Sequence, residues 1–363
     1  MVSVSAADAL QKVEDLIAHG HLAEAEKIAR RIAAAVPEYS AAQFALGDIL
    51  ERTARSDEAV AVYEAISAHH PGMGLAFSRR AMILLRRQFG APPPPRPRKS
   101  GVAVSCNKLG FSGRFANQLL QYAVTRLYGE RHGLEAEFPD WIGRDLYMID
   151  DPFVTATLPA VTEQEADIMA AAAGDADSIL AGRDFEGFFC GDTGPLKQHR
   201  TQVRAFFQPR PAIAARLQAW SRALPSHGTL VALHLRRGDF VGHDQFWIAP
   251  VAWYLAWLEA VWPGLDRPLL YVATDDSSVL AVFARYRPVT AADLGEPLAG
   301  AEFLADFHIL TQADRLAISN STFSFVAAML NERASEFLRP QKEQERLTAC
   351  DPWNEPVLLN HGP

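Results

Sequence analysis

The sequence has no long apolar run. None of its apolar stretches approaches the roughly 20 residues that a transmembrane helix needs. The first residues, Met1 to Asp8, carry neither the basic region nor the apolar region of a secretory signal peptide. The sequence therefore predicts a protein without a membrane span. We expect a cytoplasmic location, with peripheral association at the inner membrane face as the alternative.

The sequence also has few cysteines and no net positive charge. The 363 residues include 3 cysteines, Cys106, Cys190 and Cys350, which are far apart and form neither a C-x-x-C pair nor a zinc-type cluster. This pattern is typical of reduced thiols in a cytosolic protein. The 35 basic and 43 acidic residues give a net charge of −8, which argues against a broad nucleic-acid surface but allows a local basic pocket.

Residues 1–88 are rich in Ala, Leu and Glu and show helical periodicity without strand signals. They also repeat, because Ala25 and Ala59 are 34 residues apart, and so are Pro37 and Pro71. This is the period of the tetratricopeptide repeat, in which small residues occupy the helix crossings and a proline ends each unit. We therefore predict an all-α tetratricopeptide-like domain, and an unrelated helical bundle is the alternative.

Residues 89–100 contain four consecutive prolines, which cannot join a helix and favour a stiff, extended linker. From residue 101 onward, strand patterns alternate with helical patterns. That alternation predicts an α/β fold with parallel sheets. We expect two Rossmann-like subdomains that face a cleft, at residues 101–225 and 226–363.

The segment His234-Leu-Arg-Arg-Gly-Asp-Phe240 follows Thr229–Leu233, an apolar run that reads as a buried strand. Ligands of open α/β sheets bind at the carboxyl ends of strands. Arginine stays charged and presents a planar fork of donors to a phosphate. Arg236 and Arg237 thus indicate a diphosphate site, and a strand-end ion pair with Asp239 is the alternative.

Three further segments carry polar side chains at strand ends or helix starts. Residues 109–123 form a glycine-bearing loop that enters a helix. Such a start binds anions in some proteins and is an ordinary capped turn in others. Asp275 and Asp276 end another strand, where they either bind ribose or cap the next helix. Residues 319–324 form a hydroxyl-rich turn that either cradles phosphate or simply caps a helix.

A general base and a metal site are the remaining chemical questions. Asp244 and His243 lie just beyond the Arg-Arg motif, where a carboxylate would be placed to accept the proton of an incoming hydroxyl; the alternative is a solvated loop. Asp175-Ala-Asp177 is literally D-x-D, but no strand precedes it, and we interpret it as solvated surface. We expect no metal, because arginines and helix starts can neutralise a diphosphate.

Taken together, these segments resemble the α-1,2-fucosyltransferase family and its α-1,6 and protein O-fucosyltransferase relatives. Residues 113–123, 234–240 and 318–328 resemble the α-1,2 motifs, whereas residues 271–276 and 306–314 resemble the α-1,6 enzymes. The chain departs from the family pattern at Ala116, at Phe240 and at Phe325-Val326, which replaces a tryptophan pair. The last two changes are expected to reshape the acceptor side.

The resemblance implies a GT-B-like fold, GDP-fucose as the donor, inversion at the anomeric carbon and no metal cofactor. It assigns Arg236 to the β-phosphate and the departing GDP, and Asp244 to the base, with His243 at the acceptor as the alternative base. Asn117 would face the sugar or the acceptor. The implied nucleotide-sugar ligands are His234, Arg237, Asp275, Asp276, Asp306, Ser321, Thr322, Ser324, Gly113 and Arg114.

The predicted function is metal-independent fucosyl transfer from GDP-fucose to a glycan hydroxyl, with α-1,2 linkage favoured. In that assignment residues 101–225 form the acceptor side and residues 226–363 bind the GDP-sugar. The first alternative is a protein O-fucosyltransferase whose repeats hold the polypeptide acceptor or another protein partner. The others are a non-catalytic scaffold with a decayed transferase domain and a transferase that uses another donor, such as GDP-mannose.

Overall fold

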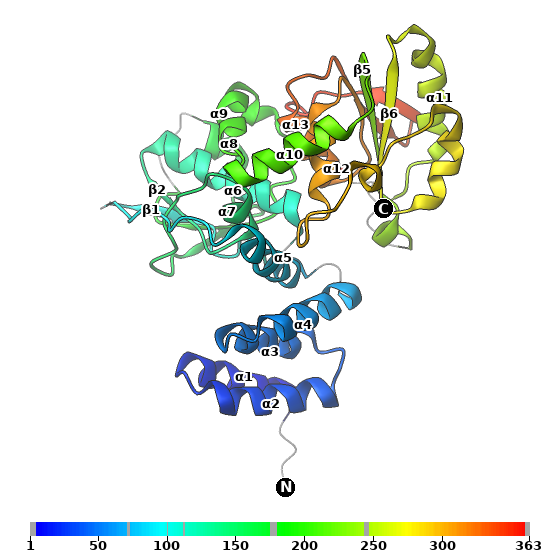
Figure 1. Cartoon of the computed structure of the whole chain (residues 1–363). Coiled ribbons are helices and arrows are strands. Elements are labelled where there is room, and N and C mark those ends of the chain that lie inside the picture. The colour runs from blue at the N-terminus through cyan, green and yellow to red at the C-terminus, as the bar shows by residue number, and fades with distance from the viewer. Residues whose placement is uncertain are drawn as a thin grey trace. The chain divides into compact units, whose positions relative to one another are not determined.

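The computed structural model describes residues 5–70, 73–99, 101–111, 113–174, 180–242 and 247–359. The chain forms two compact units (Figure 1). One unit comprises Met1–Ala91 together with Gly110–Phe115, and the other comprises Pro92–Leu109 and Ala116–Pro363. The first is helical, and the second contains both parallel sheets.

The helical unit consists of α1 (Ala6–Ala18), α2 (Leu22–Ala35), α3 (Ser40–Arg52), α4 (Ser56–His69) and α5 (Gly74–Phe89). Successive odd-numbered helices start 34 residues apart, and so do α2 and α4. Ala25 and Ala59 are fully buried, and the ring of Tyr63 lies against Gly47, where a β-carbon would not fit. The 34-residue repeat is therefore confirmed, and α5 is the first helix of a third unit.

Residues 92–99 of the proline-rich segment have no regular secondary structure and contact the first sheet. The backbone N–H of Arg96 donates to the carbonyl of Asp150 over 2.8 Å. The guanidinium of Arg96 pairs with Glu135 at 2.6 Å, and that of Arg98 pairs with Glu137 at 2.9 Å. The segment is thus extended, as its prolines predict, and ion pairs hold it in place.

The first sheet has four short parallel strands in the order β2-β1-β4-β3. Its strands are β1 (Ala103–Ser105), β2 (Glu135–Glu137), β3 (Ala160–Thr162) and β4 (Asp184–Glu186). The associated helices are α6 (Phe115–His132), α7 (Ile142–Leu146), α8 (Ile168–Ala173), η1 (Gly194–His199) and α9 (Arg200–Ala205). Strand order reverses between β1 and β4, where the Ser105 hydroxyl donates to Asp184 over 2.6 Å.

The second sheet has the order β6-β5-β7-β8-β9, and only β9 is antiparallel. Its strands are β5 (Thr229–Leu235), β6 (Pro268–Thr274), β7 (Arg315–Ala317), β8 (Glu336–Gln341) and β9 (Arg346–Ala349). Its helices are α10 (Pro211–Ala223), η2 (Gly238–Phe240), α11 (Val251–Val261), η3 (Trp262–Gly264), η4 (Ser277–Tyr286), η5 (Ala291–Leu294), α12 (Leu304–Gln312) and α13 (Thr322–Leu330). Strand order reverses between β5 and β7.

Two consecutive Rossmann-type subdomains, preceded by helical repeats, make the chain a GT-B-like α/β protein, which confirms the predicted fold class. Residues 277–286 form a 3₁₀-helix. In addition, α10 packs against α12, where the Ser221 hydroxyl lies 2.8 Å from Nε2 of His308. This contact ties α10 to the second sheet.

The segment after β9 returns to the first sheet's subdomain. Val357 donates its N–H to the carbonyl of Gly191 over 3.1 Å. The fully buried Arg339 of β8 pairs with Glu355 at 3.1 Å, and its guanidinium lies 5.3 Å from the ring centroid of Phe325. Phe325 and Val326, which replace the tryptophan pair of the family pattern, are buried. The pair packs in the core.

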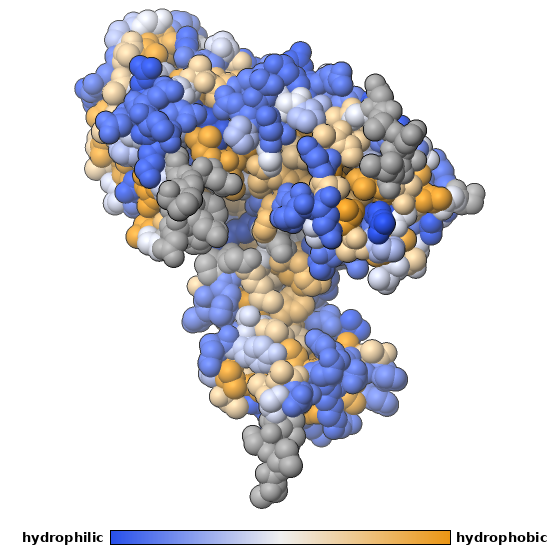
Figure 2. Space-filling view, turned by 180° about the vertical axis from the view of Figure 1, so that it is seen from behind, coloured by the Kyte–Doolittle hydropathy of each residue, from blue (hydrophilic) through white to orange (hydrophobic). Residues whose placement is uncertain are grey.

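Hydrophilic side chains are spread over the face shown in Figure 2, with smaller apolar areas between them. Across the ranges described, no helix is both long and apolar enough to cross a membrane. The three cysteines are free thiols. The exposed large hydrophobic residues of these ranges are Val102, Phe111, Met148, Phe153, Phe188, Val241 and Val282.

Candidate active site

The strands β5 and β7 end side by side at the point where strand order reverses in the second sheet. Ligands of open α/β sheets bind in the crevice at such a point. His234 near the end of β5 and Ser319 just after β7 meet there, with Nδ1 of His234 2.8 Å from the Ser319 hydroxyl oxygen. Burial and the charge of Arg236 lower the pKa of His234 to about 3. His234 is therefore neutral at neutral pH and contributes hydrogen bonding, not a proton.

Arg236 lies in a cluster of alternating charges. Its Nη2 contacts Asp239 at 2.7 Å and its Nη1 contacts Asp275 at 3.1 Å, so the ion pair with Asp239 considered from the sequence exists. A guanidinium carries five N–H donors, and these two ion pairs do not exhaust its capacity to bind oxygen. The cluster is partly exposed, which leaves Arg236 within reach of a ligand.

Asp275 and Asp276 shape the loop that carries the arginines. Asp275 accepts the backbone N–H of Arg237 over 2.8 Å, and a β-carbon at Gly238 would approach its carboxylate within 2.9 Å. Asp276 pairs with Nε of Arg237 at 3.1 Å and caps η4 by accepting the N–H of Ser278 over 3.0 Å. The capping alternative for Asp276 is therefore confirmed, and both carboxylates position the arginines.

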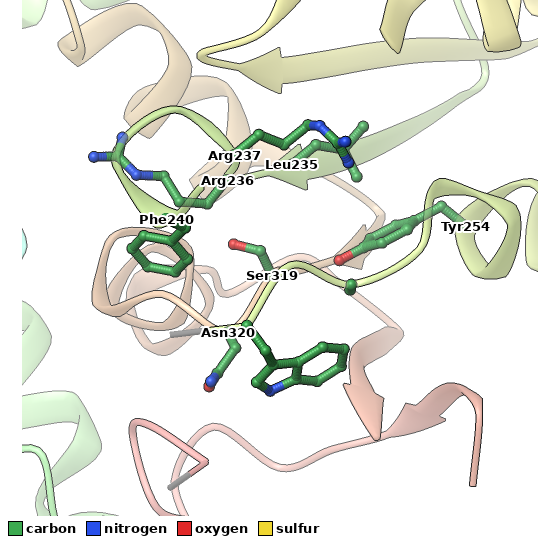
Figure 3. A pocket seen from close by; sticks show the side chains of 9 residues that line it. Leu235, Arg236, Arg237, Phe240, Tyr254, Ser319 and Asn320 are labelled. Carbon is green, nitrogen blue, oxygen red and sulfur yellow. The ribbon is translucent and has the colours of Figure 1, made fainter. Parts of the chain in front are cut away.

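A pocket opens beside this cluster (Figure 3). Arg236 and Arg237 extend from the loop in opposite directions, and Ser319 and Asn320 lie across from them. Phe240 lies below Arg236, whose guanidinium carbon is 5.7 Å from the ring centroid. The lining residues are Leu235, Arg236, Arg237, Phe240, Trp247, Ala249, Tyr254, Ser319 and Asn320. The pocket thus combines cationic, hydroxyl and aromatic walls.

The hydroxyl-rich turn opens α13, as predicted. Ser321 is the N-cap residue, and its hydroxyl accepts the N–H of Phe323 over 3.3 Å. Ser324 is fully buried and its hydroxyl lies 3.4 Å from the carbonyl of Ser321, a position that suits stabilising the turn better than contacting phosphate. The start of α13 adds the positive end of a helix dipole to the edge of the sheet that carries Arg236.

Asn117 connects this turn to the first sheet's subdomain. Its Oδ1 accepts the Thr322 hydroxyl over 3.1 Å, and its Nδ2 lies 3.7 Å from Sγ of Cys190. Asn117 is in the first turn of α6, which follows β1, whereas Cys190 follows β4. Segments from the crossover points of both sheets therefore meet at Asn117.

Asp306 lies on α12 and contacts β6, the strand that pairs with β5. The Tyr271 hydroxyl of β6 donates to its Oδ1 over 2.7 Å. Burial raises the pKa of Asp306 to about 6, and the hydrogen bond from Tyr271 opposes that rise. A carboxylate that is partly protonated near pH 6 has a pH-dependent capacity to accept hydrogen bonds.

Gly113 and Arg114 belong to Gly110–Phe115, which groups with the helical repeats. Asp244 and His243 lie outside the described residues, as does the D-x-D segment. In the part of the chain that is described, no group of three or more His, Cys, Asp or Glu side chains could hold a metal ion.

The sequence does not predict the roles of three residues at the site, because their hydrogen-bond partners are far away in the chain. These residues are Cys190, Asn320 and Tyr271. Asn320 exchanges two hydrogen bonds with the backbone of Leu359, at 2.9 and 3.1 Å. A signal for Tyr271 existed in its place on a strand that ends in two aspartates, but its partner Asp306 is 35 residues away.

The helical repeats match a family model, whereas the larger part of the chain is similar only in fold to solved structures. Residues 16–75 match the family model described as Tetratricopeptide repeat. No curated protein sequence matches the chain.

Among solved structures, the chain is similar to the NodZ α-1,6-fucosyltransferase soaked with GDP-fucose, at 14% identity and a TM-score of 0.48, covering 69% of this chain and 99% of that one. It is similar to the fucosyltransferase NodZ from Bradyrhizobium at 14% identity and a TM-score of 0.48, covering 70% and 100%. It is also similar to POFUT1 in its apo form, at 14% identity and a TM-score of 0.42, and the match covers 67% of this chain and 99% of that one.

Proposed function

We propose that the chain is a GDP-fucose-dependent glycosyltransferase that moves fucose, with inversion, to a glycan hydroxyl, with α-1,2 linkage favoured. The observation that carries the proposal is the meeting of His234 and Ser319 at the crossover point of the second sheet. It brings the Arg-Arg loop and the start of α13 to one edge of the sheet. Both of these sequence segments resemble fucosyltransferase motifs.

The arginines of this edge offer N–H donors to a sugar diphosphate. Arg236 is held by Asp239 and Asp275, and Arg237 by Asp276, so that three carboxylates face two arginines. A diphosphate would take over oxygen contacts on Arg236 that the carboxylates now make. The positive end of α13 adds to the attraction, because backbone N–H groups at a helix start bind anions. In this proposal, the arginine fork and the helix start supply the neutralising charge.

The proposed reaction is a single inverting displacement. The acceptor hydroxyl oxygen forms a bond to the anomeric carbon of fucose, while the bond from that carbon to the β-phosphate oxygen breaks. The electron pair leaves with GDP, where Arg236 stabilises the growing charge. The proton of the acceptor goes to Asp244, with His243 as the alternative base. In this scheme, the neutral imidazole of His234 and the carboxylate of Asp306 hold the nucleoside.

Binding and product analysis test the proposal. Calorimetry with GDP, GDP-fucose and GDP-mannose should show binding of GDP and selectivity for GDP-fucose. Mass spectrometry of oligosaccharide acceptors incubated with GDP-fucose should show the mass of one added deoxyhexose, and linkage analysis then separates α-1,2 from α-1,6. Activity should survive EDTA. Absence of GDP binding would favour the non-catalytic scaffold instead.

The helical repeats favour one second candidate, a protein O-fucosyltransferase. Helical repeats commonly bind peptides on a concave surface, and residues 16–75 match such a repeat. The same donor assay with unglycosylated proteins in place of oligosaccharides separates the two. Transfer to proteins alone would replace the glycan acceptor in the proposal.

A further inference from the structure

The loop that follows β4 has an unusually constrained backbone. The Glu163 carboxylate accepts the N–H of Phe188 over 3.0 Å and the N–H of Phe189 over 2.9 Å. Gln121 of α6 donates its Nε2 to the carbonyl of Gly187 over 2.9 Å. A β-carbon at Gly187 would lie 2.8 Å from Cδ of Glu163, so the carboxylate fits only because residue 187 is glycine. Two side chains from other elements thus fix this loop.

The two phenylalanines of the loop have opposite environments. Phe189 is 1% exposed and adopts a positive φ of 53°, a conformation that non-glycine residues rarely hold. Phe188 is 42% exposed. Strained backbone persists where surrounding contacts determine it, and it clusters at ligand-binding sites. Turning Phe189 inward leaves Phe188 as the aromatic side chain that the loop presents to solvent.

This loop adjoins the proposed active site on the acceptor side. It follows β4, at the point where strand order reverses in the first sheet. The Cys190 thiol lies 3.6 Å from the carbonyl of Phe188, and its Sγ lies 3.7 Å from Nδ2 of Asn117. Asn117 in turn accepts the Thr322 hydroxyl. Three successive contacts therefore connect the backbone of Phe188 to the start of α13.

We propose that Phe188 is the platform on which the acceptor sugar stacks. A pyranose ring carries an apolar face of C–H groups, and an exposed aromatic ring buries such a face favourably. Single exposed hydrophobic residues are common on protein surfaces. Phe188 differs because its loop is fixed and because its backbone carbonyl contacts Cys190, the residue that contacts Asn117. The inference rests on the proposed transferase function and names its acceptor as an oligosaccharide.

Matched variants test this assignment in the full chain. Phe188→Ala removes the ring and Phe188→Tyr keeps it. Phe153→Ala is the control, because Phe153 is 45% exposed in the same unit but its ring already contacts Arg144, 4.8 Å away. Lactose, N-acetyllactosamine and chitotriose serve as acceptor probes. Initial rates give the KM for each acceptor, and hydrolysis of GDP-fucose without acceptor reports on the donor site.

We expect Phe188→Ala to raise the acceptor KM at least tenfold while hydrolysis and the KM for GDP-fucose stay within twofold. Phe188→Tyr and Phe153→Ala should keep the acceptor KM within twofold of the wild type. An unchanged acceptor KM in Phe188→Ala overturns the assignment, and so does a parallel loss of hydrolysis. Wild-type hydrolysis without transfer to any of the three sugars also overturns it. If the wild type neither binds nor hydrolyses GDP-fucose, the proposed function itself fails.

Discussion

The hydroxyl of Thr322 donates to Oδ1 of Asn117 over 3.1 Å, and this bond joins the first turns of two helices that belong to different sheets. Asn117 begins α6 after β1, and Thr322 begins α13 after β7. This contact helps to hold the start of α13 against the start of α6. In the proposed function these are the donor side and the acceptor side, so that loss of the contact is expected to affect the alignment of the two substrates more than the affinity for either one.

Thr322→Val should therefore lower kcat while leaving GDP affinity nearly unchanged. The variant keeps the shape of the side chain but loses the donor, and a net hydrogen bond is worth about 1 kcal/mol, which corresponds to roughly a fivefold change in rate. Thr322→Ser retains the hydroxyl and should restore turnover. Steady-state kinetics with GDP-fucose and calorimetry with GDP measure the two effects. A lower GDP affinity with normal kcat would assign Thr322 to the phosphates.

Arg236→Ala should abolish transfer without unfolding the protein. Loss of a preorganised donor to a developing negative charge costs roughly 10²–10³ in rate. The ion pairs of Arg236 with Asp239 and Asp275 are partly exposed, and such pairs contribute little to stability. Melting followed by circular dichroism should show a small change in Tm.

Two further variants sharpen this test. Arg236→Lys keeps the charge but not the planar fork, and we expect it to remain strongly impaired. Arg285→Ala, which removes an exposed arginine paired with Glu259 at 2.6 Å, should be fully active. Near-normal turnover in Arg236→Ala is the result that the proposed mechanism cannot accommodate.

Gly74 at the start of α5 gives a prediction about the helical unit. A β-carbon at residue 74 would overlap the backbone carbonyl of Gly113 within the same unit. Gly74→Ala should therefore destabilise this unit by about 1–3 kcal/mol, the usual cost of overpacking. Gly264→Ala is the control, since its β-carbon would meet nothing within 4 Å. Equal Tm values for the two variants in thermal melting would show that the loop at Gly113 moves freely.

Sequence patterns predicted those features that depend on local chemistry. The sequence predicts the seven-residue apolar strand β5 and the caps of η4 and α13, because each of these features depends on contiguous residues. The three-residue strands β2, β3 and β4 were missed, since three residues are too few to establish a period. The sequence also does not show which charged side chains pair with one another. The pairing of Arg236 with Asp275 depends on β5 lying beside β6, which only the folded sheet decides.

Asp306 predicts a pH dependence of donor binding. Its pKa is raised to about 6 by burial, so its carboxylate is ionised at pH 7 and mostly protonated at pH 5. If it accepts hydrogen bonds from the nucleoside, the Kd for GDP-fucose should rise roughly tenfold between pH 7 and pH 5. GDP-fucose is the appropriate probe, because its diphosphate is esterified at both ends. The pKa of His234, about 3, lies below this window.

Asp306→Asn should remove that pH dependence and bind GDP-fucose with a constant, weaker affinity. The pH dependence of thermal stability tests the ionisation of Asp306 independently of donor binding. Because the folded-state pKa of Asp306 exceeds the unfolded value of 3.8, its favourable contribution is present at low pH and is lost as the pH rises through about 6. The Tm of Asp306→Asn relative to the wild type should therefore increase between pH 4 and pH 7. A pH-independent difference would mean that Asp306 ionises normally and does not control donor binding.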